Sequence, residues 1–305
     1  MIALLASLDS FLSSRIMTDL FYGLALGVIY ALVALSLVII WQSTHVLNFA
    51  QGAMATFATF VGMTQLDRGL NWWVCFAIAI LFGFLFGGFT ERVLIRPLYG
   101  KPEINPIVVM VGLLGLLEAI GQTFWSSSTR NYPAPFSQDY WQLHGRLVAL
   151  SAWVIFEFFL AVVIMVSILI LFQFTNIGLR LRAAALAPEV ARLLGVRVNR
   201  MLTLGWMIAS AVGTIAAIIV TAGTGGLNVN VMDAFFVSGF IAAAIGGLDS
   251  PVGAVIGGIV LGVTTDFVRD YWSGNAAQLT PLVALLVVLM IRPEGLFSKS
   301  TTRRV

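Results

Sequence analysis

The sequence predicts an all-α fold: a single polytopic transmembrane helical bundle over residues 1–305 with about 8–10 membrane segments, some short or broken. Hydrophobic residues make up 59% of the 305 residues and charged residues only 10%. Mean hydropathy is +0.97. Several uncharged runs also reach a length of about 20 residues, which a helix needs to cross a bilayer. Together these observations indicate an integral membrane protein rather than a soluble domain.

The first fourteen residues, MIALLASLDSFLSS, are partly apolar but contain Asp9 and no basic residue. A cleaved signal peptide would begin with positive charge. We therefore expect residues 1–18 to form an interfacial helix ahead of the first span.

Hydropathy predicts nine membrane segments, which place the two termini on opposite sides of the membrane. Their expected positions are residues 20–41, 46–66, 72–91, 105–125, 150–174, 201–222, 234–248, 251–268 and 278–292. With a cytoplasmic C-terminus, the inside segments are 92–104, 175–200 and 292–305, which hold 12 of the 17 Lys and Arg residues. This distribution follows the positive-inside rule, so we expect a cytoplasmic C-terminus.

The loop at residues 126–149 is rich in aromatic, proline and polar residues. Such a composition predicts a structured cap at the membrane interface. Composition does not distinguish a connector from a gate.

The segments at 234–248 and 251–268 are short and rich in glycine, with a tight turn, GGLDSP, between them. Such segments are typical of broken or re-entrant helices, which line pathways because protein or water must cover their freed backbone groups. A four-residue glycine spacing, which lets helices pack closely, occurs at Gly253 and Gly257 and again at Gly258 and Gly262.

The inside loop at residues 175–200 contains a predicted short surface helix. Pro188 suits the first helical position, Glu189 suits the first turn, and Gly195 suits a C-terminal cap. The arginines of this loop would also attract anionic lipid. The residues alone therefore allow either a lipid-bound interfacial helix or a helix that docks on a protein.

The stretch THVLNFAQGAMATFATFVG, residues 44–62, places Asn48 and Gln51 on one helical face. Lipid offers side-chain amides no hydrogen-bonding partner, so both must face other helices or a wet cavity. The sequence leaves two roles open for these amides: packing between helices, or lining a pathway. The pair Leu47–Asn48 also recurs as Leu227–Asn228 before another span, a faint indication of repeated halves.

Glu118 is the only charged residue in the segment INPIVVMVGLLGLLEAIGQTFW. An unpaired carboxylate in hydrocarbon costs on the order of 3 kcal/mol or more, so Glu118 must face protein or water. Gln122 follows one turn later on the same face. With Ser238 these residues complete the predicted substrate pathway. Inter-helix hydrogen bonding is the alternative role for Glu118.

Several chemistries lack the residues that they need. The single cysteine, Cys75, cannot form an intramolecular disulfide, and His45 and His144 give no metal-ligand spacing. There is no G-x-x-x-x-G-K-[ST] run for phosphate binding and no recognisable pair of nucleophile and base. We therefore predict no enzyme activity, no metal, no cofactor and no nucleic-acid partner.

The motif VLNFAQGAMA resembles the LNFAHG signature of LivH-type branched-chain amino acid ABC transporter permeases, in which it follows a span similar to GLALGVIYALVALSLVIIWQST. FIAAAIGGLDSPVGAVIGGIVLGV is similar to the family's late Gly-Gly, Ser-Pro, Gly-Gly segment, and GLRLRAAALAPEVARLLGVRVNR resembles its inside loop. Gln51 stands where many members carry His, and Ala53 where an acidic residue is common. These departures leave open a substrate such as urea or a short amide.

The resemblance implies a permease subunit of a binding-protein-dependent ABC importer for branched-chain or other small amino acids, in a bacterial cytoplasmic (inner) membrane. The implied partners are ABC ATPase subunits, a second homologous (LivM-like) permease or a second copy of this chain, an extracytoplasmic solute-binding protein and membrane lipid. The family's cytoplasmic coupling helix corresponds to residues 183–195. The residues expected to couple to the ATPase are Arg180, Arg182, Ala184, Ala187, Pro188, Glu189, Arg192, Leu194 and Gly195.

A proton-coupled secondary transporter is an alternative function. It would need paired acids, or an acid and a base, deep within the spans, and Glu118 is a lone candidate. A channel would instead show repeated pore-lining motifs. Co-purification with ATPase subunits favours the importer, whereas proton-driven uptake without them favours the carrier.

Overall fold

The computed structural model describes residues 15–126, 128–140, 142–143, 146–147, 151–292 and 295–297. Of the interfacial helix predicted over residues 1–18, residues 1–14 lie outside this part of the chain, and the remaining residues open the first described helix. His144 also lies outside it.

The protein is all-α and polytopic, as predicted. Among the described residues, seven helical segments are long and apolar enough to cross a membrane. They are α2 (Arg15–Thr44), α4 (Trp72–Thr90) with its continuations η1 (Glu91–Ile95) and η2 (Arg96–Leu98), α5 (Ile104–Trp125), α6 (Ala152–Phe174), α9 (Val198–Thr224), α11 (Pro251–Tyr271) and α12 (Gly274–Ile291). Two shorter apolar helices, α3 (Gln51–Asp67) and α10 (Asp233–Gly246), account for the other predicted segments.

The two glycine-rich late segments differ in length. α10 has 14 residues and extends about 21 Å, less than the about 30 Å of a hydrocarbon core, as expected of a partial crossing. α11 has 21 residues and is long enough to cross, which corrects the prediction of a short segment. It continues past the predicted end at residue 268 to Tyr271, and Asp266 and Arg269 form an ion pair within its last turns.

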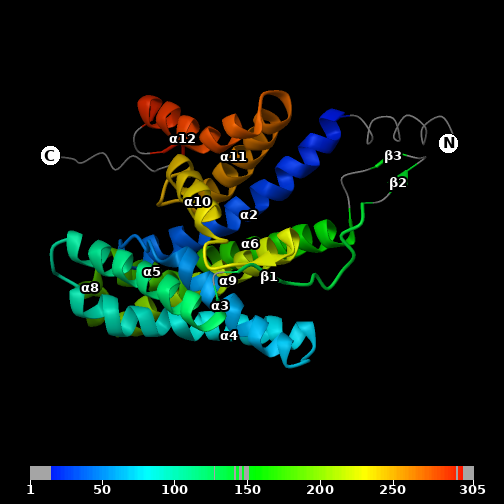
Figure 1. The fold of residues 1–305 in the computed structure, drawn as a ribbon. Coiled ribbons are helices and arrows are strands. Elements are labelled where there is room, and N and C mark those ends of the chain that lie inside the picture. The colour runs from blue at the N-terminus through cyan, green and yellow to red at the C-terminus, as the bar shows by residue number, and fades with distance from the viewer. Residues whose placement is uncertain are drawn as a thin grey trace.

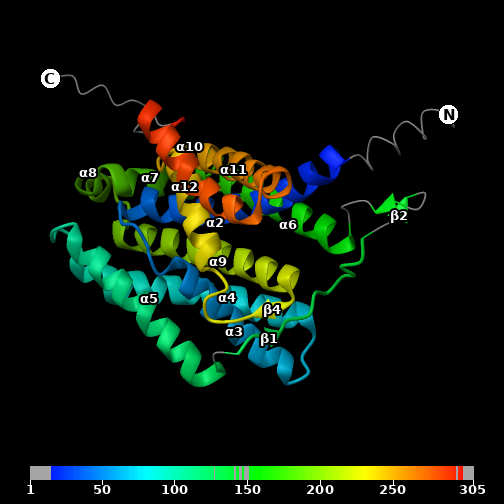
Figure 2. The same ribbon diagram turned by 45° about the horizontal axis from the view of Figure 1, so that its top comes forward.

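α2 lies between two groups of helices. Figure 1 shows α10, α11 and α12 on one side of α2 and α3, α4, α5 and α9 on the other, and Figure 2 shows the same division from a tilted view. α2 packs most extensively against α11 and also against α9 and α10. The bundle is therefore organised around a helix that is almost wholly buried in its central turns.

Small residues bring α2 and α11 into contact. A Cβ on Gly258 would lie 2.5 Å from the Cα of Ala31, and one on Gly262 would collide with the backbone of Gly27. Only glycine fits where two backbones approach this closely. The close packing predicted from the four-residue glycine spacing is confirmed.

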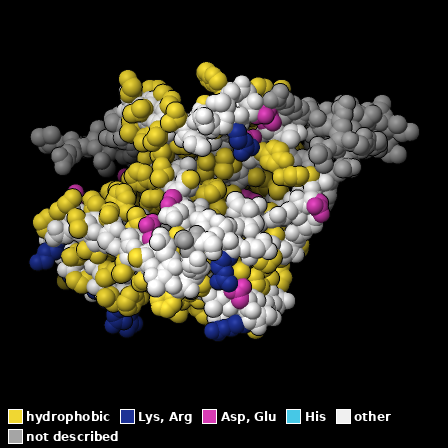
Figure 3. Space-filling model, viewed as in Figure 1, with side chains coloured by type: hydrophobic (Ala, Val, Ile, Leu, Met, Phe, Trp, Pro, Cys, Tyr) yellow, Lys and Arg dark blue, Asp and Glu magenta, His cyan; other side chains and the backbone are white. Residues whose placement is uncertain are grey.

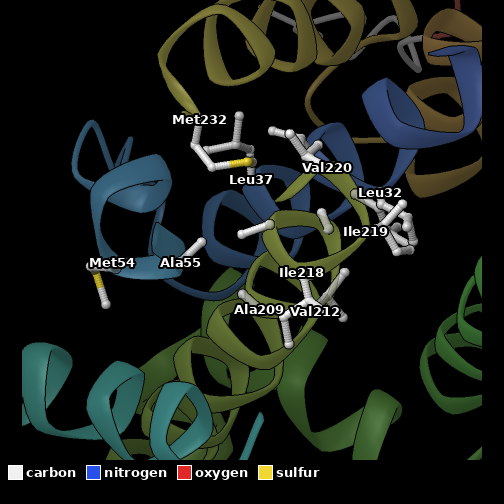
Figure 4. Close-up of a cluster of buried hydrophobic side chains, with 14 of the residues drawn as sticks. Leu32, Leu37, Met54, Ala55, Ala209, Val212, Ile218, Ile219, Val220 and Met232 are labelled. Atoms are coloured by element: carbon white, nitrogen blue, oxygen red, sulfur yellow. The ribbon is translucent and has the colours of Figure 1, made fainter. Parts of the chain in front are cut away.

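The main hydrophobic core lies where α2, α3 and α9 meet the segment before α10. The close-up in Figure 4 labels ten of its side chains: Leu32, Leu37, Met54, Ala55, Ala209, Val212, Ile218, Ile219, Val220 and Met232. Toward the sides of the bundle hydrophobic side chains are exposed instead, and they cover much of the face in Figure 3. That pattern is typical of a protein whose sides contact lipid or other membrane chains.

The end of the bundle where α3 meets α4 carries short β-ribbons, and we call it the ribbon end. β1 (Arg130–Asn131) pairs antiparallel with β4 (Gly226–Leu227), and β2 (Gln142–Leu143) pairs with β3 (Arg146–Leu147). The described part of the loop at 126–149 is attached to the helices beside it, because Trp72 donates to the carbonyl oxygen of Pro133 at 3.0 Å. Tyr132 is buried, and its burial raises the pKa of its phenol.

The opposite end carries two short helices, α7 (Asn176–Leu186) and α8 (Pro188–Leu193), and we call it the α8 end. The indole nitrogen of Trp206 donates to the Thr44 hydroxyl at 3.1 Å, which joins α9 to the end of α2. Trp41 and Gln42 donate to Asp249 in the turn between α10 and α11. These bonds hold the helix ends together on this side.

Candidate functional site

Asn48 and Gln51 lie together at the start of α3 and are both almost fully buried. The Asn48 side-chain nitrogen donates to Gln51 Oε1 at 2.9 Å, and the Gln51 nitrogen donates to the carbonyl oxygen of Ala209 in α9 at 3.1 Å. Asn48 Oδ1 accepts from the backbone N–H of Ala50. In this structure the two amides therefore join α3 to α9, as in the packing alternative, and their polar atoms are satisfied by protein.

The starts of α3 and α10 resemble each other and meet. Asn48 accepts a hydrogen bond from the backbone two residues later, and Asn228 does the same from Asn230, both at 3.0 Å. A Cβ on Gly52 would lie 3.2 Å from the Cβ of Phe236, so the first turns of the two helices are in contact. The recurrence of Leu-Asn in the sequence thus corresponds to a shared turn.

Glu118 lies on a small crevice between α3 and α5. The crevice is lined by Ala53, Thr56, Phe57, Phe60, Leu117, Glu118, Gly121 and Val229. Within the described part of the chain, the half-buried Glu118 carboxylate has no hydrogen bond or ion pair. Asp233 lies in the first turn of α10, which contacts the start of α3 at Gly52. The crevice therefore combines apolar walls with uncompensated negative charge.

The other two predicted pathway residues are not on this crevice. Gln122 is exposed and lines a recess with Ser126 and Arg130 toward the ribbon end. Ser238 is buried on α10. The structure thus brings Asn48 together with Gln51. It places Glu118, Gln122 and Ser238 in three other surroundings.

Sequence reasoning missed Asp233 and Thr56. Asp233 follows the run LNVNVM, and its side chain accepts a hydrogen bond from Asn230 at 2.9 Å. The repeated Leu-Asn pair was the signal for this helix start, since asparagine turns commonly precede helices. Thr56 carries no signal of its own, because a buried threonine in a span usually bonds its own helix, as Thr56 does with Gly52.

The inside loop forms two helices where a single one was predicted. The Thr175 hydroxyl caps α7 by accepting from the backbone of Gly178, and α8 opens with Pro188 and Glu189 as expected. Gly195 has φ +80, which suits the predicted glycine after the helix end. Ala183, Ala184 and Ala185 belong to α7, and Ala187 lies between the two helices, as the residue before a proline disfavours helical geometry.

The two faces of this segment differ. Ala184 of α7 and Ala191 of α8 are buried against Val198 and Leu202 at the start of α9. Ala184, one of the residues expected to couple to the ATPase, thus faces the protein's own interior. The exposed side carries four large hydrophobic residues, which are Leu186, Val190, Leu193 and Leu194.

The remaining residues of the predicted coupling set are exposed. They are Arg180, Arg182, Ala187, Pro188, Glu189, Arg192 and Gly195. The α8 end thus presents hydrophobic side chains beside several arginines. We call Leu186, Val190, Leu193 and Leu194 the α8 surface.

Comparisons with known proteins agree over nearly the whole chain. BraD of Pseudomonas aeruginosa, a high-affinity branched-chain amino acid transport system permease protein, is 26% identical over 294 residues, covering 93% of this chain and 96% of that protein. LivH of Escherichia coli K12, which has the same description, is 24% identical over 304 residues, covering 94% and 97%. The fructose import permease protein FruF of Bifidobacterium longum is 23% identical and covers 82% of this chain and 69% of that protein.

A solved structure, PsaBC from Streptococcus pneumoniae in complex with Fab, matches with a TM-score of 0.52 and 16% identity, covering 96% of this chain and 97% of that one. At this identity the likeness concerns the fold alone. The family model for the permease component of the branched-chain amino acid transport system matches residues 20–291. The chain therefore belongs to this family of permease components and is a multi-pass membrane protein.

Proposed function

We propose that the chain is the permease subunit of a binding-protein-dependent ABC importer for amino acids with apolar side chains. The observation that carries this proposal is the α8 surface. Leu193 and Leu194 are 88% and 77% exposed at one end of the bundle, on a segment that makes no membrane-spanning helix. Hydrophobic side chains this exposed favour contact with another protein.

The neighbouring charges suggest what that protein is like. Arg180, Arg182 and Arg192 flank the α8 surface and are exposed. An apolar groove with an acidic rim would complement them. The proposed occupant is an ATPase subunit, because the chain has no phosphate-binding motif of its own. The α8 end is then cytoplasmic, as the predicted orientation of the C-terminus requires.

The lining of the crevice at Glu118 matches the chemistry of an amino acid. Its volume in this structure is only about 10 Å³, so the proposal requires α3 and α5 to move apart when the substrate enters. An uncompensated carboxylate attracts the α-ammonium group, and the walls formed by Phe57, Phe60 and Leu117 suit an apolar side chain. Urea or a short amide is less well matched, because Asn48 and Gln51 already use their hydrogen bonds within the protein. The relatives BraD and LivH are described as branched-chain amino acid permeases, and we extend that substrate class to this chain.

The assembly proposed around this subunit follows from its exposed sides. α5 makes few contacts within the chain, and Cβ atoms on Gly112 and Gly115 would meet no other atom within 4 Å. We propose that a second permease, LivM-like or a second copy, completes the pathway, and that a solute-binding protein docks at the ribbon end. The location would be a bacterial cytoplasmic membrane.

The test replaces an exposed leucine by a charged residue at each end of the bundle. Leu193→Glu is expected to abolish co-purification of the ATPase subunits and ATP-dependent uptake, because it places a carboxylate in an apolar contact. The control, Leu70→Glu, changes a partly exposed leucine in the loop between α3 and α4 and should retain both. Retained ATPase binding by Leu193→Glu, or proton-driven uptake by the wild-type chain without ATPase subunits, would contradict the proposal.

A further inference from the structure

A buried carboxylate lies where α4 continues into η1. Glu91 is the first residue of this π-helical turn, and its side chain is fully buried at the α8 end. π-helical turns inside α-helices are rare and occur frequently at functional sites.

Three side chains satisfy the Glu91 carboxylate. Arg96 binds both oxygens, with its Nε 3.2 Å from Oε1 and an Nη 2.8 Å from Oε2. The Tyr99 hydroxyl donates to Oε1 at 2.9 Å, and the Thr203 hydroxyl lies 2.8 Å from Oε2. Burial and the neighbouring Glu91 carboxylate raise the pKa of the Tyr99 phenol, so Tyr99 remains a donor. We call these four residues the Glu91 cluster.

The Glu91 cluster joins segments far apart in the sequence. Glu91, Arg96 and Tyr99 belong to the end of α4 and the turn after it, whereas Thr203 lies near the start of α9. Arg96 also donates to the carbonyl oxygen of Asn199 at 3.3 Å. Removing one member of a buried charged network leaves the others unsatisfied, which makes such a joint stiff.

Tyr99 connects this joint to the coupling segment. Its ring packs on the small hydrophobic cluster formed by Ala184 of α7, Ala191 of α8, and Val198 and Leu202 of α9. The same residue therefore packs through its ring on the cluster that includes Ala191 of α8, and bonds to Glu91 through its hydroxyl. A displacement of α8 would be transmitted through Tyr99 to α4 and α9.

α4 and α9 then continue the connection into the membrane. A Cβ on Gly87 would lie 2.5 Å from the carbonyl oxygen of Trp206, and one on Gly88 would lie 2.8 Å from Met207 Cγ, so the two helices are in close contact. α9 in turn holds α3 through the bond from Gln51 to Ala209. α3 forms a wall of the crevice at Glu118.

We propose that Glu91 is a positioning residue that, with Arg96, Tyr99 and Thr203, fixes α8 to the α4–α9 pair and thereby couples ATP hydrolysis to movement of the crevice. This inference rests on the proposed function, because it takes α8 as the docking helix. The proposed link from α8 to the crevice runs through packed and hydrogen-bonded contacts. Contact alone does not establish coupling, so the test must measure ATP hydrolysis against solute uptake.

The test removes single hydroxyl groups while keeping side-chain shape. Thr203→Val and Tyr99→Phe each remove a partner of Glu91, and Tyr99→Phe keeps the ring in place. The matched control is Thr64→Val at the ribbon end, where the Thr64 hydroxyl accepts from Trp125 at 2.8 Å. All variants are assembled with the ATPase subunits and binding protein in proteoliposomes, where uptake and ATP hydrolysis are measured together.

We expect all three variants to retain the ATPase subunits and to lower the melting temperature by similar small amounts. Thr203→Val and Tyr99→Phe should raise the number of ATP molecules hydrolysed per solute several-fold, whereas Thr64→Val should leave it unchanged. An unchanged ratio in both cluster variants, or an equal rise in the control, would overturn the inference. Failure of the wild-type chain to bind ATPase subunits would instead refute the proposed function.

Discussion

The side-chain nitrogen of Gln51, at the start of α3, donates a hydrogen bond to the carbonyl oxygen of Ala209, near the middle of α9. This bond requires glycine at position 213, because a Cβ there would collide with the Gln51 amide. α3 is thus held against α9 by a polar contact within an otherwise hydrophobic core. The bond fixes the position along α9 at which the short α3 begins.

Replacing Gln51 by leucine should destabilise the protein by about 1–3 kcal/mol, because the buried Asn48 amide loses its partner. The measurement is thermal unfolding in detergent. Gln122→Leu is the control, since Gln122 is exposed and has no partner within the described residues. Equal melting temperatures for the two variants would show that the amide pair does not stabilise the fold.

The same substitution at two glycines should have opposite consequences. Gly258→Ala places a methyl group 2.5 Å from the Cα of Ala31, so α2 and α11 must separate and stability should fall. Gly115→Ala meets no atom within 4 Å and should be neutral or stabilising by up to about 1 kcal/mol. The melting temperatures of both variants, compared with that of the wild type, measure these two effects. A neutral Gly258→Ala would mean that the contact between α2 and α11 is looser than described.

The ion pair between Arg130 and Asp67 at the ribbon end should contribute little. Its atoms are 2.7 Å apart, but both side chains are about a third exposed, so solvent screens the attraction. Arg130→Ala is expected to cost less than about 1 kcal/mol, and less still at high salt. Thermal unfolding at two salt concentrations, with Arg68→Ala as the control, measures this. A large effect that does not depend on salt would require a different role for Arg130.

Hydropathy and glycine spacing predicted most of the fold. The nine segments correspond to helices because a spanning helix needs a long apolar run, which is visible in any window of the sequence. The short length of α10 was also predicted from its glycines. The full length of α11 was not, because the apolar run ends where Asp266, Arg269 and Asp270 begin, whereas the helix continues to Tyr271.

The site was harder to predict than the fold. Asn48 and Gln51 carried a clear signal, but a sequence does not reveal whether an amide meets a backbone carbonyl or water, and here Gln51 meets Ala209. Ala184 was expected to couple to the ATPase, but the segment forms two helices divided at Pro188, and Ala184 is buried on the first of them. Glu91 escaped notice because its partner Thr203 is remote in sequence.

Glu118 provides the most direct test of the substrate class. If its carboxylate receives the α-ammonium group of an amino acid, Glu118→Gln removes a charge-assisted contact worth about 1.5–3 kcal/mol. Uptake of branched-chain amino acids should then fall by about tenfold or more, since each 1.4 kcal/mol is a factor of ten. ATP hydrolysis stimulated by the binding protein should persist, because Glu118 lies on the crevice rather than at the α8 end. Gln122→Ala, one turn away and exposed, is the matched control and should transport nearly as well as the wild type. A loss no greater than that of the control would exclude Glu118 from substrate recognition, and a parallel loss of ATP hydrolysis would assign it to packing between α3 and α5.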